Sequence, residues 1–393
     1  IIMSIVVSGL GIVSSLGIGV EENLSQLYSG QSGISLCPEI LITNNKLPVG
    51  EIRYSNEQLK EKLGISANKV ISRTALLGML AVKEAIIDSQ IDVTSYKIGL
   101  ISSTSVGGMD QTEIFFKDYI KDNTKGDLRQ VLMHDCAAST KAICNYCNIN
   151  GYSTTISTAC SSSANAIIKG YSLLKHGVLD AVIVGGCDAL SAFTLNGFKS
   201  LMILDKELCK PFDERRAGLN LGEGAGYIVL QREEDCNKKY CRLSGFANTN
   251  DAFHQTASSE NGEGAYLAMN KALSMAGLHP ESIDYINAHG TGTPNNDLTE
   301  SIAISRIFNQ KMPLICSTKS YTGHTLAASG GIEAVFSILS IKEGFVPESL
   351  NFAVPMHNGV IPNTSLHRQE IKTVLSNSFG FGGNCSTLIF SKQ

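Results

Sequence analysis

The sequence predicts an α/β fold in which helices cover a central sheet. Short apolar runs alternate with helix-like segments along most of the 393 residues, and this alternation is typical of sheets buried by helices. Glycine and serine stand at nearly every strand end, where turns require them. A weak internal similarity within the sequence further indicates that the chain has two related halves.

The predicted strands are spread over the whole chain, each as a short apolar run bounded by turn-forming residues. Between the third and fourth strands, Ile167, Tyr171 and Leu174 recur at spacings of four and three, which predicts a helix that ends near Gly177. In order, the strands are Ser4–Val7, Lys97–Ser102, Thr154–Thr158, Ala181–Val184, Tyr285–Asn287, Leu314–Cys316 and Val374–Ser376.

Both halves end with a glycine-rich turn followed by a strand. In the first half Gly222-Glu-Gly-Ala-Gly226 leads into Tyr227–Leu230, and in the second Gly380-Phe-Gly-Gly383 leads into Ser386–Phe390. The charged stretch Gln231–Lys239 between them is typical of a connection. We therefore predict two α/β halves, residues 1–235 and residues 236–393.

Charge and hydrophobicity exclude two classes of function. The net charge is −4, with no basic run long enough to follow a nucleic-acid backbone, so no nucleic-acid partner is expected. The longest apolar runs are about ten residues, whereas a membrane-spanning helix needs about twenty. Residues Ile1–Leu16 lack a basic leading segment and contain Gly9 and Gly11, so a strand and turn is favoured over a signal peptide.

The eleven cysteines show no disulfide-like rhythm. Such usage fits a reducing compartment, and a cytoplasmic location is expected. Cys144 and Cys147 form a C-x-x-C pair without a second pair at metal-ligand spacing, so we interpret them as structural thiols.

One cysteine has the setting of a nucleophile. Cys160 lies in Ser157-Thr-Ala-Cys-Ser-Ser-Ser163, between a predicted strand and the helix described above. Free backbone N–H groups and the positive end of the helix dipole favour a thiolate there, which predicts a pKa below the usual value of about 8.5. A thiolate can take an acyl group from a thioester at little cost, because one thioester replaces another.

Two histidines lie in glycine-rich segments that follow predicted strands. His289 belongs to Asn287-Ala-His-Gly-Thr-Gly-Thr-Pro294, and His324 ends Lys319-Ser-Tyr-Thr-Gly-His324. Loops at strand ends gather catalytic side chains in α/β proteins. Two neutral imidazoles that donate to one carbonyl oxygen would stabilise an enolate, which decarboxylation of a malonyl thioester requires. The histidines interpreted as structural are His134, His176, His254, His279, His357 and His367.

A metal site built on His289 and His324 is the alternative interpretation. It needs a third ligand, and Asp297 is the nearest obvious carboxylate. Because no His-Glu-x-x-His motif occurs, we expect no metal.

Taken together, these motifs resemble the β-ketoacyl-acyl carrier protein synthases of the thiolase superfamily, in the elongating class with a Cys-His-His set. The resemblance covers essentially the whole chain and implies a thiolase-like fold, with two similar α/β halves in a layered αβαβα body. The motifs that carry it are Val7-Ser-Gly-Leu-Gly-Ile-Val-Ser-Ser-Leu-Gly17, Val106-Gly-Gly108, Thr158-Ala-Cys-Ser-Ser162, Lys210-Pro-Phe-Asp213, Gly222–Gly226, both histidine segments and Asn377-Ser-Phe-Gly-Phe-Gly-Gly383.

The resemblance implies a role for each matching residue. Cys160 would accept an acyl chain from the phosphopantetheine arm of an acyl carrier protein, and His289 and His324 would promote decarboxylation of the malonyl extender. The backbone N–H groups of Cys160 and Phe381 would form an oxyanion hole. No separate cofactor and no metal are implied. The supporting positions are Lys319 and Glu333, which order the histidine region; Thr291 and Thr293, which bind pantetheine amides; Phe381 and Phe379 at the gate; and Val106 and Phe198 near the acyl pocket.

Several positions depart from the family pattern. Ala217 replaces the aspartate of an Arg-Asp-Gly motif, and Asn384-Cys385-Ser386 replaces the usual continuation after Gly383. These departures favour a specialised synthase, acting in a polyene or related lipid pathway.

Two alternatives stay open. The first is that the protein is the catalytic half of a heterodimer with a chain-length partner subunit, and does not form a homodimer. The other is a coenzyme A-dependent thiolase, for which Cys385 would be the second cysteine.

Overall fold

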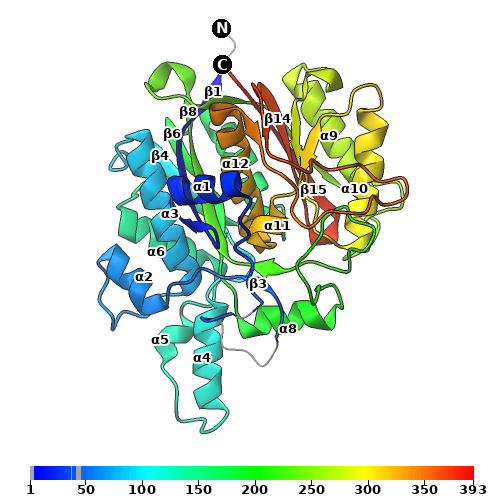
Figure 1. Ribbon diagram of the computed structural model, residues 1–393. Helices are drawn as coiled ribbons and strands as arrows, with labels where there is room; N and C mark the ends of the chain where they lie inside the picture. Colours follow the sequence, from blue (N-terminus) through cyan, green and yellow to red (C-terminus); the bar gives the residue numbers. More distant parts are fainter. Residues whose placement is uncertain (1–3, 37, 41–45) are drawn as a thin grey trace.

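The computed structural model describes residues 4–36, 38–40 and 46–393. Within them, eleven strands form one mixed sheet, seen in Figure 1. From edge to edge it runs β11 (Leu314–Cys316), β10 (Tyr285–Asn287), β14 (Thr373–Phe379), β15 (Asn384–Ser391), β9 (Cys241–Asn250), β1 (Ile5–Ser14), β8 (Gly224–Arg232), β6 (Ala181–Asp188), β4 (Ile98–Ser103) and β5 (Ser153–Ile156), and β2 (Gly17–Ile18) pairs with β1.

The two halves of this sheet repeat one pattern. In the N-terminal half β5, β4 and β6 are parallel, and β8 and β1 follow as antiparallel neighbours. In the C-terminal half β11, β10 and β14 are parallel, and β15 and β9 follow in the same way. The halves meet where β1 pairs with β9 at Val6 and Val7. Two similar α/β halves are thus confirmed, while the boundary between residues 235 and 236 stays a prediction.

Helices make the other three layers of the expected αβαβα body. On one outer side α3 (Arg73–Ser89) packs on β1 and β8, and on the other α9 (Glu263–Ala276) packs on β9 and β15. Between them lie α7 (Ser162–Lys175) and α12 (Ser329–Glu343), and α12 contacts both β8 and β14. The remaining helices are α1 (Val20–Ser29), α2 (Asn56–Leu63), α4 (Met109–Tyr119), α5 (Leu128–Val131), α6 (Cys136–Cys147), α8 (Ala192–Ser200), α10 (Pro294–Ile307) and α11 (Lys319–Thr322).

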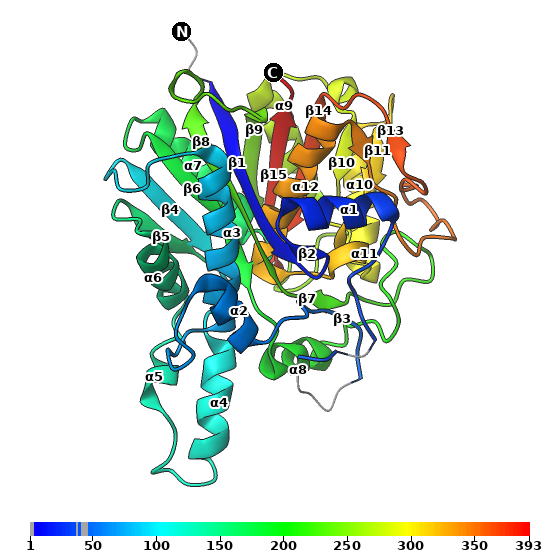
Figure 2. The ribbon, with the colours of Figure 1, turned by 60° about the vertical axis from the view of Figure 1, so that its left-hand side comes forward.

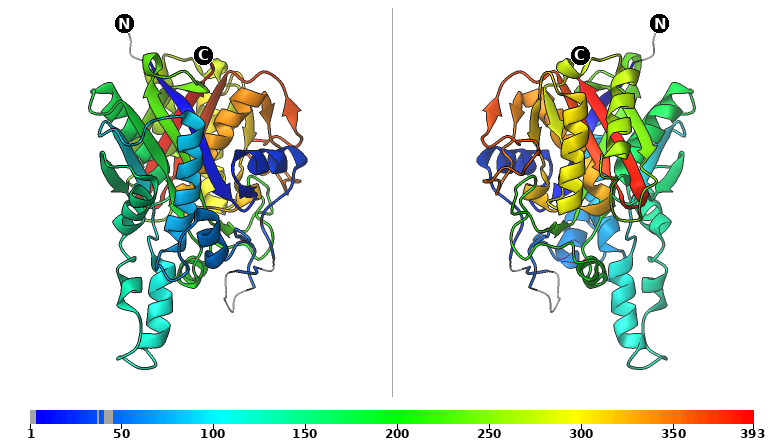
Figure 3. Two further views of the ribbon diagram at one scale, coloured as in Figure 1. Left: turned by 90° about the vertical axis from the view of Figure 1, so that its left-hand side faces the viewer. Right: turned by 90° about the vertical axis from the view of Figure 1, so that its right-hand side faces the viewer.

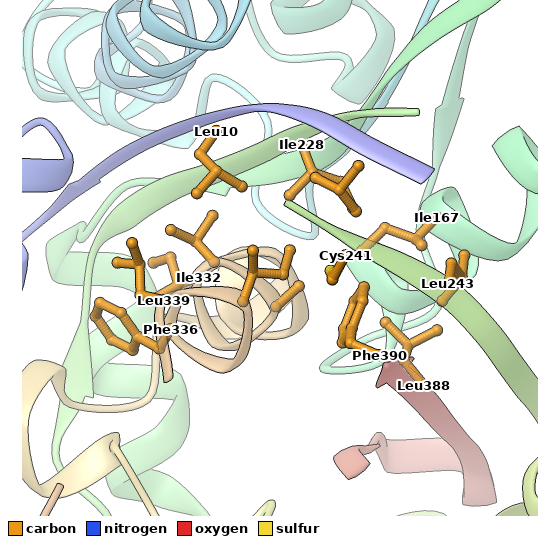
Figure 4. Close-up of a cluster of buried hydrophobic side chains, with 14 of the residues drawn as sticks. Leu10, Ile167, Ile228, Cys241, Leu243, Ile332, Phe336, Leu339, Leu388 and Phe390 are labelled. Carbon is orange, nitrogen blue, oxygen red and sulfur yellow. The ribbon is translucent and has the colours of Figure 1, made fainter. Parts of the chain in front are cut away.

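The largest apolar core surrounds α12. All residues from Ser329 to Ile341 are buried, because this helix has a sheet on each side. Figure 4 shows Ile332, Phe336 and Leu339 of α12 facing Leu10 of β1 and Ile228 of β8. The helix therefore fastens one half of the chain to the other.

Glycines in two strands lie against the backbone of a packed helix, and one of these strands begins in the segment that was predicted as a turn. Gly11 belongs to β1, where a Cβ atom would approach the Ala81 carbonyl oxygen of α3 to 1.9 Å. Gly226 belongs to β8, where a Cβ atom would come within 2.3 Å of the Ile332 nitrogen of α12. These glycines allow helix and strand backbones to touch, so the predicted turn at Gly222–Gly226 is wrong.

The outline of the molecule is compact except for one arm. Helices α4 and α5, with the loop that joins them, project away from the sheet, as Figures 2 and 3 show. No helix among the described residues has the length and apolarity needed to cross a membrane. Of the segment Ile1–Leu16, predicted as a strand and turn, residues 1–3 lie outside the described residues, and the predicted strand Ser4–Val7 overlaps the start of β1.

Candidate active site

Cys160 lies on a tight elbow between β5 and α7. Ala159 adopts a left-handed conformation with φ of 54°, which is strained for a residue with a side chain, and Ser161 is the N-cap of α7. The elbow thus directs the Cys160 side chain toward the C-terminal half. The expected position at a helix N-terminus is confirmed, and Cys160 is 6% exposed.

His324 follows α11 and is held by its Nδ1 atom. The backbone N–H of Leu326 donates to Nδ1 at 3.0 Å, and Ser329 Oγ lies 3.1 Å away. Because a backbone N–H only donates, Nδ1 carries no proton, and the neutral ring bears its proton on Nε2. Nε2 lies 3.1 Å from Cys160 Sγ.

His289 follows β10 and is oriented in the same way. Lys319 Nζ lies 3.3 Å from its Nδ1 and donates to its carbonyl oxygen at 2.6 Å. Lys319 is itself paired with Glu333. An ammonium group can only donate, so His289 also keeps its proton on Nε2.

These three side chains converge in one cavity. The candidate ligand atoms of Cys160, His289 and His324 lie within 4.8 Å of one another, and the two imidazole planes are almost perpendicular, at 89°. The cavity has a volume of about 250 Å³ and also receives Phe198, Thr291, Thr293, Phe379 and Phe381. A cysteine sulfur therefore faces two imidazole N–H groups, and all three side chains are buried.

Burial determines the charge state of this cluster. It raises the pKa of Cys160 to about 11, against the opposing influence of Lys319 and of the Phe381 and Cys160 backbone N–H groups. It also lowers the pKa of His289 and of His324 well below the usual value, and the Lys319 charge acts in the same direction. Both rings are neutral, as expected. The expected low thiol pKa is wrong, because desolvation outweighs the helix N-terminus.

The predicted pocket residues are mostly brought together. Thr291 and Thr293 share a hydrogen bond of 2.8 Å at the cavity wall, and the Phe381 ring stacks on Phe198 with centroids 6.1 Å apart. Phe379 lies against His289. Val106 is not among the residues that line the cavity; it packs, as Phe198 does, against the adjoining apolar cluster.

Asp297 is engaged elsewhere and is not the third member of a metal site. Its carboxylate accepts from the backbone N–H groups of Phe212 and Gly292. The side chain that completes a potential ligand set with the two histidines is Cys160. Asp297 instead holds two loops at the cavity wall.

Sequence reasoning missed several residues that shape the site. Glu300 is fully buried and accepts from the backbone N–H groups of His289 and Gly290, each at 2.8 Å. It lies one helical turn after Asp297 in α10, and this spacing is the signal that could have found it. His254, interpreted as structural, lies at the cavity instead, with its neighbours Gln255 to Ser258.

Comparison with known proteins agrees with this geometry. The family model "Beta-ketoacyl synthase, N-terminal domain" matches residues 3–236, and "Beta-ketoacyl synthase, C-terminal domain" matches residues 240–353. A curated relative, 3-oxoacyl-(acyl-carrier-protein) synthase 2 of Staphylococcus aureus strain COL, is 32% identical over 413 residues, covering 99% of this chain and 98% of its own length. A putative mitochondrial 3-oxoacyl-(acyl-carrier-protein) synthase of Schizosaccharomyces pombe is 30% identical over 427 residues, covering 99% of each chain.

Solved structures show the same fold. The ketosynthase ApeO of Xenorhabdus doucetiae, determined in complex with its chain length factor ApeC, has a TM-score of 0.85 and 32% identity, and the match covers 100% of this chain and 98% of that one. The ishigamide ketosynthase/chain length factor has a TM-score of 0.92 and 26% identity, and covers 100% and 99%.

Fold and site thus define a condensing acyltransferase with a thiolase-like fold. Because the two family models together match most of its length, the chain belongs to the β-ketoacyl synthase family.

Proposed function

We propose that this protein is a β-ketoacyl-acyl carrier protein synthase whose nucleophile is Cys160 and whose decarboxylation donors are His289 and His324. The observation that carries the proposal is the approach of the His324 Nε2–H to Cys160 Sγ at 3.1 Å, in a cavity that also holds His289. The names of the relatives support an acyl carrier protein as the partner.

The first half-reaction is an exchange of thioesters. Cys160 Sγ attacks the acyl carbonyl, and the bond between that carbonyl and the pantetheine sulfur breaks. The thiol proton of Cys160 passes to the departing sulfur, so no net charge remains in the cavity. The backbone N–H groups of Cys160 and Phe381, which both lower the pKa of the Cys160 thiol, would stabilise the tetrahedral oxyanion.

The second half-reaction forms the carbon–carbon bond. The malonyl carboxylate leaves as CO₂, and the Nε2–H groups of His289 and His324 stabilise the enolate oxygen. The enolate carbon attacks the acyl-Cys160 carbonyl, and the C–S bond breaks to release the thiolate, which takes a proton from solvent. The product is a 3-oxoacyl chain two carbons longer, and no cofactor beyond the carried phosphopantetheine takes part.

Lys319 and Glu333 have a supporting role in this proposal. Burial raises the pKa of Glu333 to about 7, opposed by Lys319. The pair orients His289 through its Nδ1 and carbonyl oxygen. Thr291, Thr293 and Phe198 line the cavity; the two threonines would bind the pantetheine amides and Phe198 would shape the acyl pocket, with Val106 in the adjoining apolar cluster.

The experiment that tests the proposal combines malonyl-carrier protein with a panel of acyl-carrier proteins and measures product masses and the adduct on Cys160. Cys160→Ala is expected to abolish condensation. Cys160→Gln is expected to retain decarboxylation of the malonyl unit, because both imidazole donors remain. Full condensing activity of Cys160→Ala would refute the assignment.

A thiolase is a weaker candidate on this geometry. Cys385, its required second cysteine, lines the same cavity, but its sulfur is not among the atoms of Cys160, His289 and His324 that lie within 4.8 Å of one another, and burial raises its pKa to about 12. Dependence of the reaction on a malonyl substrate separates the two functions.

We further propose that the protein works as a dimer, with a second copy or with a related chain-length subunit. The arm 109–132 exposes apolar side chains on α4 and α5. Beside it, Phe193 of α8 and Leu201, directly after α8, are also exposed. Because α8 also carries Phe198 at the cavity, a partner there would reach the acyl pocket. The solved complex of a ketosynthase with its chain length factor supports the heterodimer.

The cysteines support a reducing, cytoplasmic location. All ten that the structure describes are free thiols.

A further inference from the structure

Asn384 joins three elements next to the nucleophile. Its Oδ1 lies 2.7 Å from Ser161 Oγ on the elbow, 2.9 Å from Asn165 Nδ2 on α7 and 2.7 Å from Asn248 Nδ2 on β9. Asn384 itself begins β15, directly after the turn Gly380–Gly383 that carries Phe381. The contact connects the residue after Cys160 with the residues around Phe381.

The Ser161 hydroxyl lies at the centre of this hydrogen-bond cluster. Asn165 Nδ2 donates to Thr158 Oγ1 at 2.9 Å, and Thr158 Oγ1 lies 3.1 Å from Ser161 Oγ. Ser161 Oγ has one proton and two acceptors within reach, the Thr158 carbonyl and Asn384 Oδ1, each at 2.7 Å. The Ser161 hydroxyl therefore lies between the elbow and Asn384, with an acceptor oxygen at hydrogen-bond distance on each side.

The turn that carries Phe381 lies directly on the elbow. The Gly380 N–H donates to the Asn384 carbonyl oxygen at 2.8 Å. A Cβ atom on Gly380 would lie 2.9 Å from the Thr158 carbonyl oxygen and 3.2 Å from the Cys160 nitrogen. The backbone N–H groups of Cys160 and Phe381, which both lower the pKa of the Cys160 thiol, thus come from different halves of the chain. The distance between these two N–H groups therefore depends on the contacts that hold the turn Gly380–Gly383 against the elbow.

We propose that Asn384 is a positioning residue. It acts through Ser161 to keep the Phe381 backbone N–H at a fixed position relative to the Cys160 backbone N–H at the acyl-transfer centre. This inference rests on the proposed role of Cys160 as the acylated nucleophile. The two imidazoles are fixed by Lys319, Leu326 and Ser329, so Asn384 governs acyl transfer and leaves decarboxylation to the histidines.

The test measures the two half-reactions separately in Asn384→Ala. Self-acylation of Cys160 by an acyl-carrier protein is expected to slow by about ten- to a hundredfold, because a displaced oxyanion donor loses much of its effect. In the Cys160→Gln background, Asn384→Ala is expected to change malonyl decarboxylation by less than about twofold, since the imidazole donors stay in place. Unchanged acylation, or an equal fall in both rates, would overturn the inference.

Two further variants control for a general loss of structure. Asn384→Asp keeps the acceptor oxygen and is expected to acylate close to the parent rate; if it falls as far as Asn384→Ala, the inference is wrong. Asn150→Ala removes an exposed amide that donates to the Asn148 carbonyl and is expected to leave both rates unchanged. Thermal unfolding of each variant reports whether the fold is intact.

Alkylation of Cys160 by iodoacetamide tests Asn384 without any acyl substrate. Loss of the Phe381 N–H from the sulfur raises the thiol pKa, so Asn384→Ala is expected to react more slowly than the parent at the same pH. If the parent protein fails to condense, the proposed function is refuted, while this measurement still decides the role of Asn384.

Discussion

At the scale of single residues, Cys160 and His324 form a neutral pair in the resting enzyme. Burial raises the thiol pKa and lowers the imidazole pKa, so the ion pair common in cysteine nucleophiles is disfavoured here. The His324 Nε2–H donates toward the sulfur at 3.1 Å and cannot also act as the base. The incoming thioester therefore meets a protonated thiol.

We expect Cys160 alkylation to depend steeply on pH. With a thiol pKa of about 11, the thiolate fraction and hence the rate should rise about tenfold per pH unit from pH 7 to about pH 10. The measurement is mass spectrometry of the Cys160 peptide after timed iodoacetamide treatment. N-acetylcysteine in the same solution is the control and should level off above about pH 9. A Cys160 rate that levels off by pH 8 would contradict the neutral pair.

At the scale of secondary structure, the site depends on how closely α12 approaches β8. Gly226 and Gly331 bring the two backbones into direct contact, since a Cβ on either would lie 2.3 Å from an atom of the other element. Ser329, at the start of α12, touches the His324 Nδ1. Helix packing and the orientation of a catalytic ring are therefore set by the same contact.

Gly226→Ala is expected to lower the free energy of unfolding by about 1–3 kcal/mol, because the added methyl group must displace α12. Urea unfolding measures the change as a lower midpoint at an unaltered slope. Gly197→Ala is the matched control: its Cβ would meet nothing within 4 Å, and alanine within a helix is expected to stabilise by about 0.5–1 kcal/mol. An equal change in the free energy of unfolding for the two variants would show that the close approach of α12 to Gly226 does not matter for stability.

The sequence predicted the elements better than their contacts. β10 and β11 have the predicted bounds, and α7 ends two residues before Gly177, because apolar periodicity and turn residues are local signals. The Gly222–Gly226 segment was misassigned because glycine serves close packing as well as turns. The Cys160 pKa was misjudged because burial by the C-terminal half cannot be read from neighbours in sequence.

Some residues of the candidate site could likewise be found from the sequence, and others could not. Cys160, His289 and His324 have distinctive local motifs and were found from them. Glu300 and Asn384 act through contacts between residues 10 or more positions apart, so only the folded chain shows their role. His254 lines the cavity because the path of the chain brings its loop there, and no local sequence pattern shows this.

At the scale of the whole molecule, the arm 109–132 projects from the body of the protein and keeps apolar side chains exposed. Leu128 and Leu132 are each 71% exposed, and apolar side chains gathered on one projection are typical of a binding surface.

Leu128→Asp combined with Leu132→Asp is expected to convert a dimer into a monomer, because charge placed in an apolar interface must be desolvated. Analytical ultracentrifugation measures the mass. Ile87→Asp is the control: Ile87 is similarly exposed, at 67%, but lies on α3, outside the arm, and should leave the mass unchanged. A parent protein that sediments as a monomer at all concentrations would refute the dimer.

The burial of α12 on every side has a consequence for biogenesis. During synthesis the last strand of the N-terminal half, β8, is complete about a hundred residues before α12 begins, and β1 is complete far earlier. Until α12 has been made, the apolar surface that it covers must face water. Nascent chains of this protein should therefore depend on chaperones until the last third of the sequence has been translated, and the two halves should reach their native state in a single late step.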